Sequence, residues 1–573
     1  MAMIMIMAFF DVLGVASIMP FMAVLVNPEI IETNAYLAYI YSNFGFTNSQ
    51  DFLYFLGLSV FVLLVISISF KAMTTYVQLR FILMREASIG KRLIAGYLNQ
   101  PYVWFLNRHS ADLGKNILSE VAEVVNSSML SLMNIFAHGL VTLVLIILLI
   151  IVNVQVALVV SIVLISFYLL FFYMGRNIIS NAGHKRLEAN NERFKIVSEV
   201  FGSIKGVKVG GLERNFVDRF SKHAKIYAKS YASAQVLSQL PRFGLELIAF
   251  GGLLLMLLIL MSGQNNLESV FPIIALYAFA GYRILPALQQ VYNGFSLWSF
   301  STSALQNLSN DINTLKLNNT YQDSFAPNIK FDKEIKLNNV VFSYPDVSKQ
   351  TLNKLNIVIP ALSSVGFVGS TGCGKTTSVD LILGLLEPQQ GTLTVDNIII
   401  DKSNRSQWLR NIGYVPQNIY LSDDSIASNI AFGIDENLVN QSFIEQAAKI
   451  ANLDEFIQKE LPDGYNTIIG ERGVRLSGGQ RQRIGIARAL YHKPKILILD
   501  EATSSLDGMT EAVVMEAIEN LGQEVTIIIV AHRLSTVRHC DNIYLLEKGQ
   551  VKSSGSFDSL KDSDKQFRSM LDL

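Results

Sequence analysis

The sequence predicts a multidomain membrane protein in which a bundle of about six transmembrane α-helices precedes an α/β domain. At 573 residues the chain is too long for one hydrophobic core. Apolar residues make up 50% of it and charged residues only 16%, a composition typical of membrane proteins. Charges are sparse up to about residue 310 and frequent afterwards. We therefore expect residues 1–310 to span a bilayer, residues 311–332 to form a linker, and residues 333–573 to fold as the α/β domain.

Charge and cysteine content exclude two other classes. The net charge of +0 gives no electrostatic basis for binding nucleic acid. Cys373 and Cys540 are the two cysteines, too few for a disulfide framework, and they fit a reducing cytosolic environment.

Apolar windows centred near residues 13, 63, 145, 165, 254 and 280 approach or exceed the length needed to cross a bilayer. The first, Met1–Val26, has no basic region or cleavage site of a signal peptide, so we interpret it as a transmembrane helix. Lysine and arginine gather in residues 85–115 and 176–225. Because basic connections lie on the cytoplasmic side, both termini are predicted to be cytoplasmic.

Helical patterns continue beyond the apolar windows, from Phe70 to Tyr97 and from Gly175 to Glu199, which predicts helices that project into the cytoplasm. The turns at their tips, residues 100–105 and 210–214, are expected to contact the α/β domain. On the opposite side, the aromatic segment Asn34–Phe44 is too short to span the membrane. It fits either an interfacial helix or a loop segment packed on neighbouring helices.

Ionisable side chains at membrane depth are costly and usually face a cavity or a partner. Lys71, Arg242 and Arg283 are such residues, and we hypothesise that they line a central cavity and attract an anionic headgroup such as a pyrophosphate. The alternative is structural pairing, for instance of Arg242 with Glu246 four residues further on one helix face. Lys71 also fits a side chain that snorkels to the interface.

A phosphate-binding loop is predicted at residues 369–377. This segment follows the apolar run Ser364–Val368 and leads into a helical pattern, as the strand, Gly-rich loop and helix of a P-loop require. Backbone N–H groups and the helix N-terminus would hold the ATP phosphates, with Lys375 on the β- and γ-phosphates and Thr376 on Mg²⁺. The predicted nucleotide-binding residues of the loop are Gly369, Ser370, Thr371, Gly372, Cys373, Gly374, Lys375, Thr376 and Thr377.

Two further strands carry candidate site residues. The apolar run 496–499 ends in Asp500 and Glu501, as a buried parallel strand delivers acids to the edge of a sheet. We expect Asp500 to hold Mg²⁺ and Glu501 to polarise the attacking water. The alternating run 335–344 ends on Tyr344, whose ring could stack on a purine base.

Leu476–Gln480, with the sequence Leu-Ser-Gly-Gly-Gln, resembles the signature of ABC-transporter ATPases. Other elements of that family are present elsewhere in the chain. Gln417 matches the Q-loop, Glu471–Gly473 the X-loop, Ser504–Asp507 the D-loop, His532 the switch histidine and Tyr344 the A-loop aromatic.

With the predicted membrane half, the chain resembles type I exporter (type IV) half-transporters, which implies ATP-driven transport by a homodimer in the cell inner membrane. The resemblance implies that Glu501, His532 and Gln417 are catalytic, and that Thr376, Gln417 and Asp500 bind Mg²⁺. It also implies that a second copy completes the site. Because no residue departs from the catalytic pattern, we expect two working sites. The residues implied to contact ATP outside the P-loop are Tyr344, Ser477, Gly478, Gly479, Gln480 and Asp507.

Among exporters, the chain resembles bacterial lipid-linked oligosaccharide flippases of the protein glycosylation pathway. The resemblance rests on the short external segment and on Leu240–Arg242, Tyr282–Pro286 and Ile412–Leu421. It implies a polyprenyl-pyrophosphate-linked glycan as the cargo. The alternatives are an exporter of hydrophobic drugs, lipids or peptides and, from another class, an ATP-gated channel or regulator. An intact Glu501 counts against the last of these.

Overall fold

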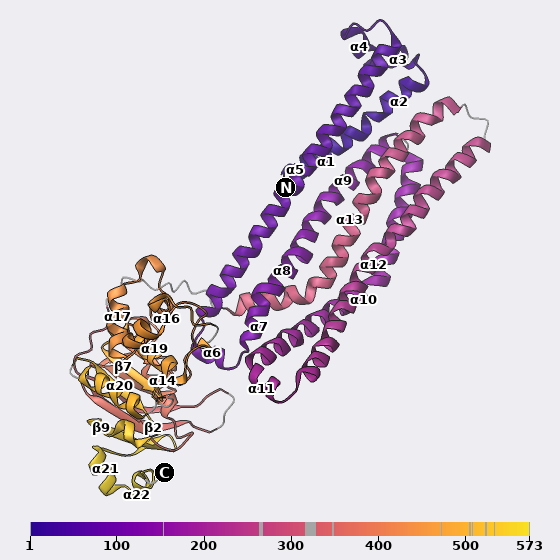
Figure 1. Ribbon diagram of the computed structural model, residues 1–573. Coiled ribbons are helices and arrows are strands. Elements are labelled where there is room, and N and C mark those ends of the chain that lie inside the picture. Colours follow the sequence, from indigo (N-terminus) through magenta and orange to yellow (C-terminus); the bar gives the residue numbers. More distant parts are fainter. Residues whose placement is uncertain are drawn as a thin grey trace. The chain divides into compact units, whose positions relative to one another are not determined.

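A computed structural model describes residues 2–152, 154–262, 267–315, 328–345, 349–470, 473–503, 506, 508–521, 524–531 and 533–571. Of residues 155, 156, 159, 160, 249, 252, 253, 255–262, 267–277 and 520, only the backbone is described. The chain forms two compact units (Figure 1). The helical unit comprises Met1–Gln100 and Asn107–Asn318, and the α/β unit comprises Pro101–Leu106 and Asn319–Leu573.

Long helices that lie side by side build the helical unit (Figure 1). Their bounds are α1 Ala2–Ala16, α2 Ile18–Val26, α3 Ile30–Thr33, α4 Ala35–Asn43, α5 Ser49–Leu98, α7 Ser110–Lys115, α8 Val121–Glu123, α9 Leu130–Val152, α10 Val154–Gly202, α11 Ile204–Val209, α12 Glu213–Ser262 and α13 Leu267–Thr314. Two π-helical segments, Asn116–Glu120 and Val124–Met129, join α7, α8 and α9 into one continuous rod.

In the described part of the chain, four segments are long and apolar enough to cross a membrane: Ala2–Val26, Ser49–Leu98, Ser110–Val152 and Ser161–Gly202. Only 11% of the apolar windows in the second and fourth segments is buried, so most of their apolar surface is available to lipid. The windows predicted near residues 254 and 280 include side chains that are not described. The count of six transmembrane helices therefore stays a prediction.

The first predicted transmembrane helix is interrupted at Ser17, between α1 and α2. Pro20 lies in the first turn of α2 and lacks the N–H that would bond the Ala16 carbonyl, so a continuous helix would lose a hydrogen bond there. The Ser17 hydroxyl instead donates to the Gly14 carbonyl at 2.9 Å. Ala2–Val26 is nevertheless long and apolar enough to cross a membrane, so the predicted first transmembrane helix contains an interruption at Ser17.

The external aromatic segment forms α4. The Asn34 side chain caps this helix by accepting hydrogen bonds from the N–H groups of Tyr36 and Leu37, at 3.0 and 3.3 Å. Leu37 is buried in a cluster with Ile31 and Phe52, whereas Tyr36 is 84% exposed. The segment thus packs on its neighbours through one face and keeps tyrosines free on the other.

The last helix runs further than the composition suggested. α13 continues to Thr314, so the predicted linker of residues 311–332 begins inside a helix, and residues 316–327 lie outside the described part. The Asp311 carboxylate accepts hydrogen bonds from Tyr97 and Asn116, both at 2.8 Å. These contacts hold the end of α13 against the end of α5 and the start of the first π-helical segment.

Two sheets form the α/β unit, which confirms the predicted fold class. Antiparallel strands form the first sheet, in the order β2-β1-β4-β5, and the second has the order β10-β9-β3-β8-β7-β6. In the second sheet β6, β7, β8, β3 and β9 run parallel and β10 is antiparallel. The strands are β1 Glu334–Phe342, β2 Leu352–Pro360, β3 Ser364–Val368, β4 Gln390–Val395, β5 Ile398–Ile399, β6 Ile412–Val415, β7 Ile496–Asp500, β8 Thr526–Val530, β9 Asn542–Glu547 and β10 Gln550–Gly555.

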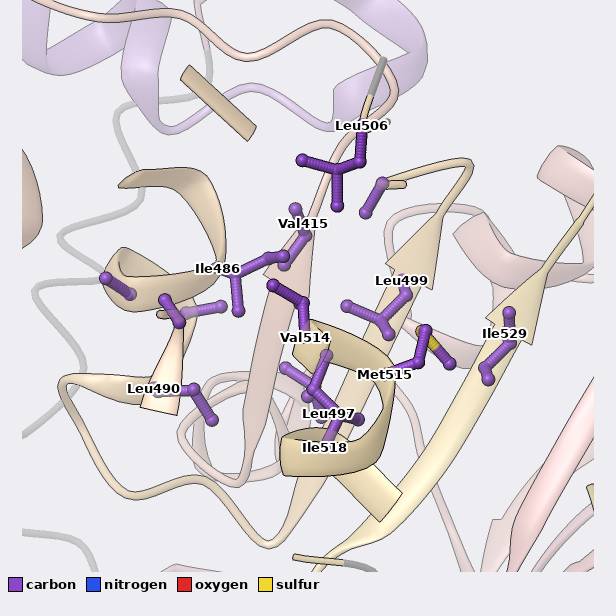
Figure 2. Packing of buried hydrophobic residues seen from close by; sticks show 14 of the residues in the cluster. Val415, Ile486, Leu490, Leu497, Leu499, Leu506, Val514, Met515, Ile518 and Ile529 are labelled. Carbon is purple, nitrogen blue, oxygen red and sulfur yellow. The ribbon is translucent and has the colours of Figure 1, made fainter. Parts of the chain in front are cut away.

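Helices cover these sheets and complete two hydrophobic cores. One core joins β7 and β8 to α20 and α19 (Figure 2). The other includes Phe367 and Trp408, and Val103 of the short helix α6 packs against it. The helices of this unit are α6 Tyr102–Leu106, α14 Lys375–Ile382, α15 Arg405–Leu409, α16 Ile426–Ile430, α17 Gln441–Ile450, α18 Asp454–Glu460, α19 Gly478–Leu490, α20 Gly508–Leu521, α21 Phe557–Ser563 and α22 Lys565–Ser569.

Candidate nucleotide-binding and catalytic site

The carboxyl ends of four neighbouring parallel strands carry the predicted site residues. In the order β3-β8-β7-β6, these strands lead to the P-loop, to Ala531, to Glu501 and to Gln417. β7 is buried along its whole length, as its unbroken apolar sequence predicted, and β8 is buried along its whole length as well. In open parallel sheets ligands bind at this edge, so the topology brings residues that are up to 162 positions apart to one place.

Glycines give the P-loop its shape. Gly369, Gly372 and Gly374 have φ angles of 146°, 78° and 109°, a region that side chains with a Cβ rarely adopt. A Cβ on Gly369 would also lie 2.4 Å from the Leu546 carbonyl oxygen. The loop can therefore turn tightly and lead straight into the N-terminus of α14 at Lys375, where partial positive charge favours an anion.

The Lys375 side chain is bonded to the backbone at the start of the P-loop. Its Nζ donates to the carbonyls of Gly369 at 2.7 Å and Ser370 at 3.4 Å, and the residue is only 6% exposed. Thr376, by contrast, is exposed, as a ligand for Mg²⁺ must be. Cys373 is buried, so its thiol contributes to packing below the loop rather than to the surface that would face a nucleotide.

Tyr344 lies beside the P-loop. Its hydroxyl is 3.1 Å from the Thr377 hydroxyl, and its half-buried ring meets the Phe342 ring edge-on, with the ring centroids 5.1 Å apart. Burial raises the pKa of the Tyr344 phenol, so the group stays neutral at physiological pH. Stacking on a purine base remains a prediction.

Gln417 and Glu501 are in direct contact. The Gln417 Nε2 donates to the Glu501 Oε2 at 2.6 Å. Glu501 has a φ of 53°, a left-handed conformation that costs a residue other than glycine on the order of 1 to 3 kcal/mol. Such strain persists only where the surroundings hold it, and it is common at active sites. The contact and the strain together support a functional position for this carboxylate.

A second acidic residue near Asp500 could not be recognised in the sequence. Asp500 is 4% exposed and accepts a hydrogen bond of 3.4 Å from the Tyr414 hydroxyl. Asp380, in α14, is 8% exposed, and burial, followed by the charge of Asp500, raises the pKa of its carboxyl to about 6. The one signal in the sequence is a charged residue inside the apolar run that follows the P-loop.

The α6 segment also approaches this region. Burial raises the pKa of Tyr102, and the carboxyl of Asp380 and the phenol of Tyr344 add to the effect, which places the Tyr102 phenol within electrostatic range of both. The sequence predicted that the tip at residues 100–105 contacts the α/β domain, and Pro101–Leu106 indeed belongs to the α/β unit. The other predicted tip, residues 210–214, lies in the helical unit.

The signature segment opens α19. Ser477 is the N-cap: its hydroxyl accepts from the Gln480 N–H at 3.2 Å, while the Gln480 side chain accepts from the Ser477 N–H at 2.8 Å. This capping box fixes the helix start and leaves Ser477 exposed. Within the described residues, no hydrogen bond or ion pair joins Leu476–Gln480 to the P-loop.

Asp507 and His532 lie outside the described residues, as do Glu471, Arg472, Ser504 and Ser505. In the described part, no three histidine, cysteine or acidic side chains gather as a metal site. That is compatible with an ion such as Mg²⁺, which protein sites usually bind through one or two carboxylates together with substrate phosphates.

Both arginines predicted at membrane depth are paired. Arg283 donates to the Asp11 Oδ1 at 3.0 Å, and the Ser67 hydroxyl donates to the same oxygen at 2.7 Å. Arg242 donates to the Glu246 Oε1 at 2.9 Å on an exposed helix face. Lys71 is half-buried, and its ammonium makes no hydrogen bond or ion pair with any described residue.

Comparison with known proteins covers both units. Residues 352–504 match the ABC transporter family, and residues 17–281 match the ABC transporter transmembrane region. The chain is 31% identical over 446 residues to ABC transporter B family member 29, chloroplastic, of Arabidopsis thaliana, which covers 77% of this chain and 69% of that protein. It is 33% identical over 390 residues to the ATP-dependent lipid A-core flippase of Legionella pneumophila (strain Paris), covering 67% and 64% of the two chains.

Among solved structures, a bacterial Atm1-family ABC exporter with ATP bound has the same fold. The TM-score is 0.80 at 23% sequence identity, over 98% of this chain and 96% of that chain. The two family matches and the Arabidopsis relative indicate the same family. The P-loop, β7 and the signature segment are arranged as that family requires. The chain belongs to the ABC transporter family and carries its ATPase domain, which couples ATP hydrolysis to transport.

Proposed function

We propose that the chain acts as a homodimeric exporter that uses ATP to flip a polyprenyl-pyrophosphate-linked oligosaccharide, or a related lipid-linked glycan, across the inner membrane. The observation that carries the proposal is an excess of positive charge around Asp11 in the helical unit. Lys71 and Arg283 bring two positive charges, and Asp11 alone among their described contacts brings a negative one.

These groups belong to one cluster. Ser67, which bonds Asp11, precedes Lys71 by four residues on α5, so the two side chains lie on the same helix face. His138 of α9 is within electrostatic range of both Lys71 and Asp11. An unpaired cation at membrane depth favours an anionic headgroup and disfavours a cationic drug. Arg242 is the weakest of the three candidates, because Glu246 neutralises it.

The relatives support a glycolipid cargo over a drug. P-glycoprotein 14 of Caenorhabditis elegans is 44% identical, but over only 39% of this chain and 17% of its own length. The lipid A-core flippases match over longer stretches. The flippase of Wigglesworthia glossinidia brevipalpis is 29% identical over 82% of this chain. Such long matches extend beyond the α/β unit into the part that would contact the cargo. An exporter of hydrophobic drugs, other lipids or peptides is the alternative.

For the ATPase we propose the following roles. Lys375 and the P-loop N–H groups hold the phosphates, and Tyr344 stacks on the base. Thr376, Gln417 and Asp500 hold Mg²⁺, which would neutralise phosphate charge when bound. Glu501 orients and deprotonates the attacking water, and His532 senses the γ-phosphate.

A second copy completes the site in this proposal. Ser477, Gly478 and Gly479 of that copy close over the nucleotide, together with Asp507. Gln480 acts through the capping box that fixes the start of α19. The lack of any bond between the signature segment and the P-loop within the described chain supports a site shared between two copies. A regulator or channel that binds ATP without hydrolysing it would not need Glu501.

The cargo is tested in liposomes that contain the purified protein. ATP-driven translocation of a pyrophosphate-linked glycolipid is compared with that of a cationic drug. We expect the glycolipid to move and Lys71→Met to slow it by about tenfold, the effect of losing one charge contact of roughly 1.4 kcal/mol. Lys225→Met, which removes an exposed lysine of α12, serves as the control. Transport of the drug but not the glycolipid would contradict the proposal.

The ATPase roles are tested separately. Glu501→Gln should retain ATP binding and lose steady-state turnover, because the amide cannot accept the proton of the attacking water. Turnover near the original rate would show that Glu501 is not the base.

A further inference from the structure

One carboxylate, that of Glu511, contacts the segments that follow two neighbouring strands. The Thr503 hydroxyl, after β7, donates to the Glu511 Oε1 at 2.9 Å. The Thr536 hydroxyl, after β8, donates to the same oxygen at 3.4 Å, and the Arg533 NH1 lies 3.9 Å from the Glu511 Oε2. Thr503 comes two residues after Glu501, and Arg533 directly follows His532.

The position of Glu511 is fixed by packing. It lies in the first turn of α20, and Met515, four residues further on the same face, is buried. Figure 2 shows Met515, Val514 and Ile518 of α20 packed against Leu497 and Leu499 of β7 and Ile529 of β8. The Glu511 side chain is only 15% exposed. The Glu511 carboxylate is therefore held by a helix that packs on β7 and β8. It accepts hydrogen bonds from the segments that follow these two strands.

The contacts of Glu511 lie next to the predicted catalytic residue Glu501. Glu501 and Glu511 line one cavity of about 90 Å³, together with Thr503, Arg533 and Thr536. The strained φ of 53° at Glu501 needs support from the residues around it. Thr503, two residues on, provides a side-chain anchor for that segment through its bond to Glu511.

We propose that Glu511 is a positioning residue for ATP hydrolysis, which ties the segment after Glu501 to the segment after His532 and keeps both in working geometry. Glu511 itself touches neither nucleotide nor water in this scheme. The inference rests on the proposed roles of Glu501 and His532, and it adds a residue that the ABC sequence motifs discussed above do not include.

The test uses the full-length protein and four variants. Glu511→Ala removes the acceptor, Thr503→Val removes the donor while keeping the shape, and Thr503→Ser retains the donor. Glu516→Gln, an exposed carboxylate of the same helix, is the matched control. We expect Glu511→Ala and Thr503→Val each to lower kcat by about tenfold with the KM for ATP unchanged, because the groups they position act in the chemical step. Thr503→Ser and Glu516→Gln should stay near the original rate.

The double variant separates positioning from general damage. If Glu511 and Thr503 act through one bond, the double variant Glu511→Ala with Thr503→Val should be no slower than the slower single variant. Additive losses, an unchanged kcat, or a raised KM at constant kcat would each overturn the proposal. Melting temperatures measured on the same samples should stay close to that of the parent protein, and a loss of kcat that only tracks a lower melting temperature would also overturn it.

Glu501→Gln, assayed in parallel, distinguishes this inference from the proposed function. If Glu501→Gln is inactive and Glu511→Ala is fully active, only the positioning role fails. If Glu501→Gln keeps its turnover, the proposed catalytic role fails, and the positioning role falls with it.

Discussion

Replacing Asp380 with asparagine tests whether a buried carboxyl destabilises the α/β unit. Asp380 is 8% exposed, and its carboxylate accepts no hydrogen bond from any described residue. Burial, and then the charge of Asp500, raises its pKa from 3.8 to about 6. The folded state therefore binds this proton more tightly than the unfolded state does. The free energy of unfolding falls as pH rises from about 4 to about 6. Above pH 6 the whole destabilisation caused by the ionised Asp380 carboxylate is present.

The size of the effect follows from the two pKa values. The difference between 3.8 and about 6 corresponds to ~3 kcal/mol at pH 7.5 and to about half of that at pH 5. An asparagine keeps the shape and carries no charge. We expect Asp380→Asn to raise the melting temperature of the α/β unit by roughly 6 to 12 °C at pH 7.5, and by less at pH 5.

The assay is thermal unfolding of the purified full-length protein, followed by intrinsic fluorescence at both pH values. Two of the three tryptophans, Trp104 and Trp408, belong to the α/β unit. Nucleotide is left out and EDTA is added, because a cation beside Asp500 would offset the repulsion. Asp423→Asn, which changes an exposed carboxylate of the same unit, is the control. A variant that melts lower than the parent, or gains equally at both pH values, would refute the reasoning.

Three further changes test other contacts. Gly183→Ala would place a Cβ 1.9 Å from the Phe300 carbonyl oxygen, so α10 and α13 must separate, and we expect a loss of ~2 kcal/mol or more in detergent unfolding. Asp11→Leu leaves the Arg283 guanidinium without its carboxylate and should cost ~3 kcal/mol, most of which the double variant with Arg283→Met should restore; no rescue would contradict the pairing. Cys373 is 3% exposed, so a maleimide should label it slowly and MgATP should slow labelling further; fast labelling that ATP does not change would mean that the P-loop is misplaced.

The sequence alone predicted those parts of the site whose chemistry depends on local spacing. The P-loop needs glycines at fixed places before a lysine, and β7 needs an unbroken apolar run before its acids. Each requirement is met within about ten residues, so a pattern can reveal it. The same holds for Tyr344, which comes two residues after the end of β1 and lies against Thr377.

Contacts between distant segments could not be predicted in this way. Asp380 is a charged residue inside an apolar run, and only the fold shows that its side chain is buried. The ion pair of Asp11 and Arg283 joins residues that are 272 positions apart. The polar sequence near Asp311 looked like a linker, yet bonds to Tyr97 and Asn116 keep it helical, an instance of tertiary contacts overriding composition.

The short helix α6 has a consequence for how the chain folds. Val103 contributes to a core whose other members come from residue 329 onward, so that core closes across more than 200 intervening residues. Long-range closure of this kind is slow, and it comes after local structure has formed. During synthesis, residues 101–106 are made well before residues 329 onward, and they can pack only after those residues have been made. A fragment that starts at residue 333 would lack them altogether and expose the apolar surface that Val103 covers. The structural domain is therefore a discontinuous one, and truncations meant to isolate the ATPase should carry α6 as an added segment.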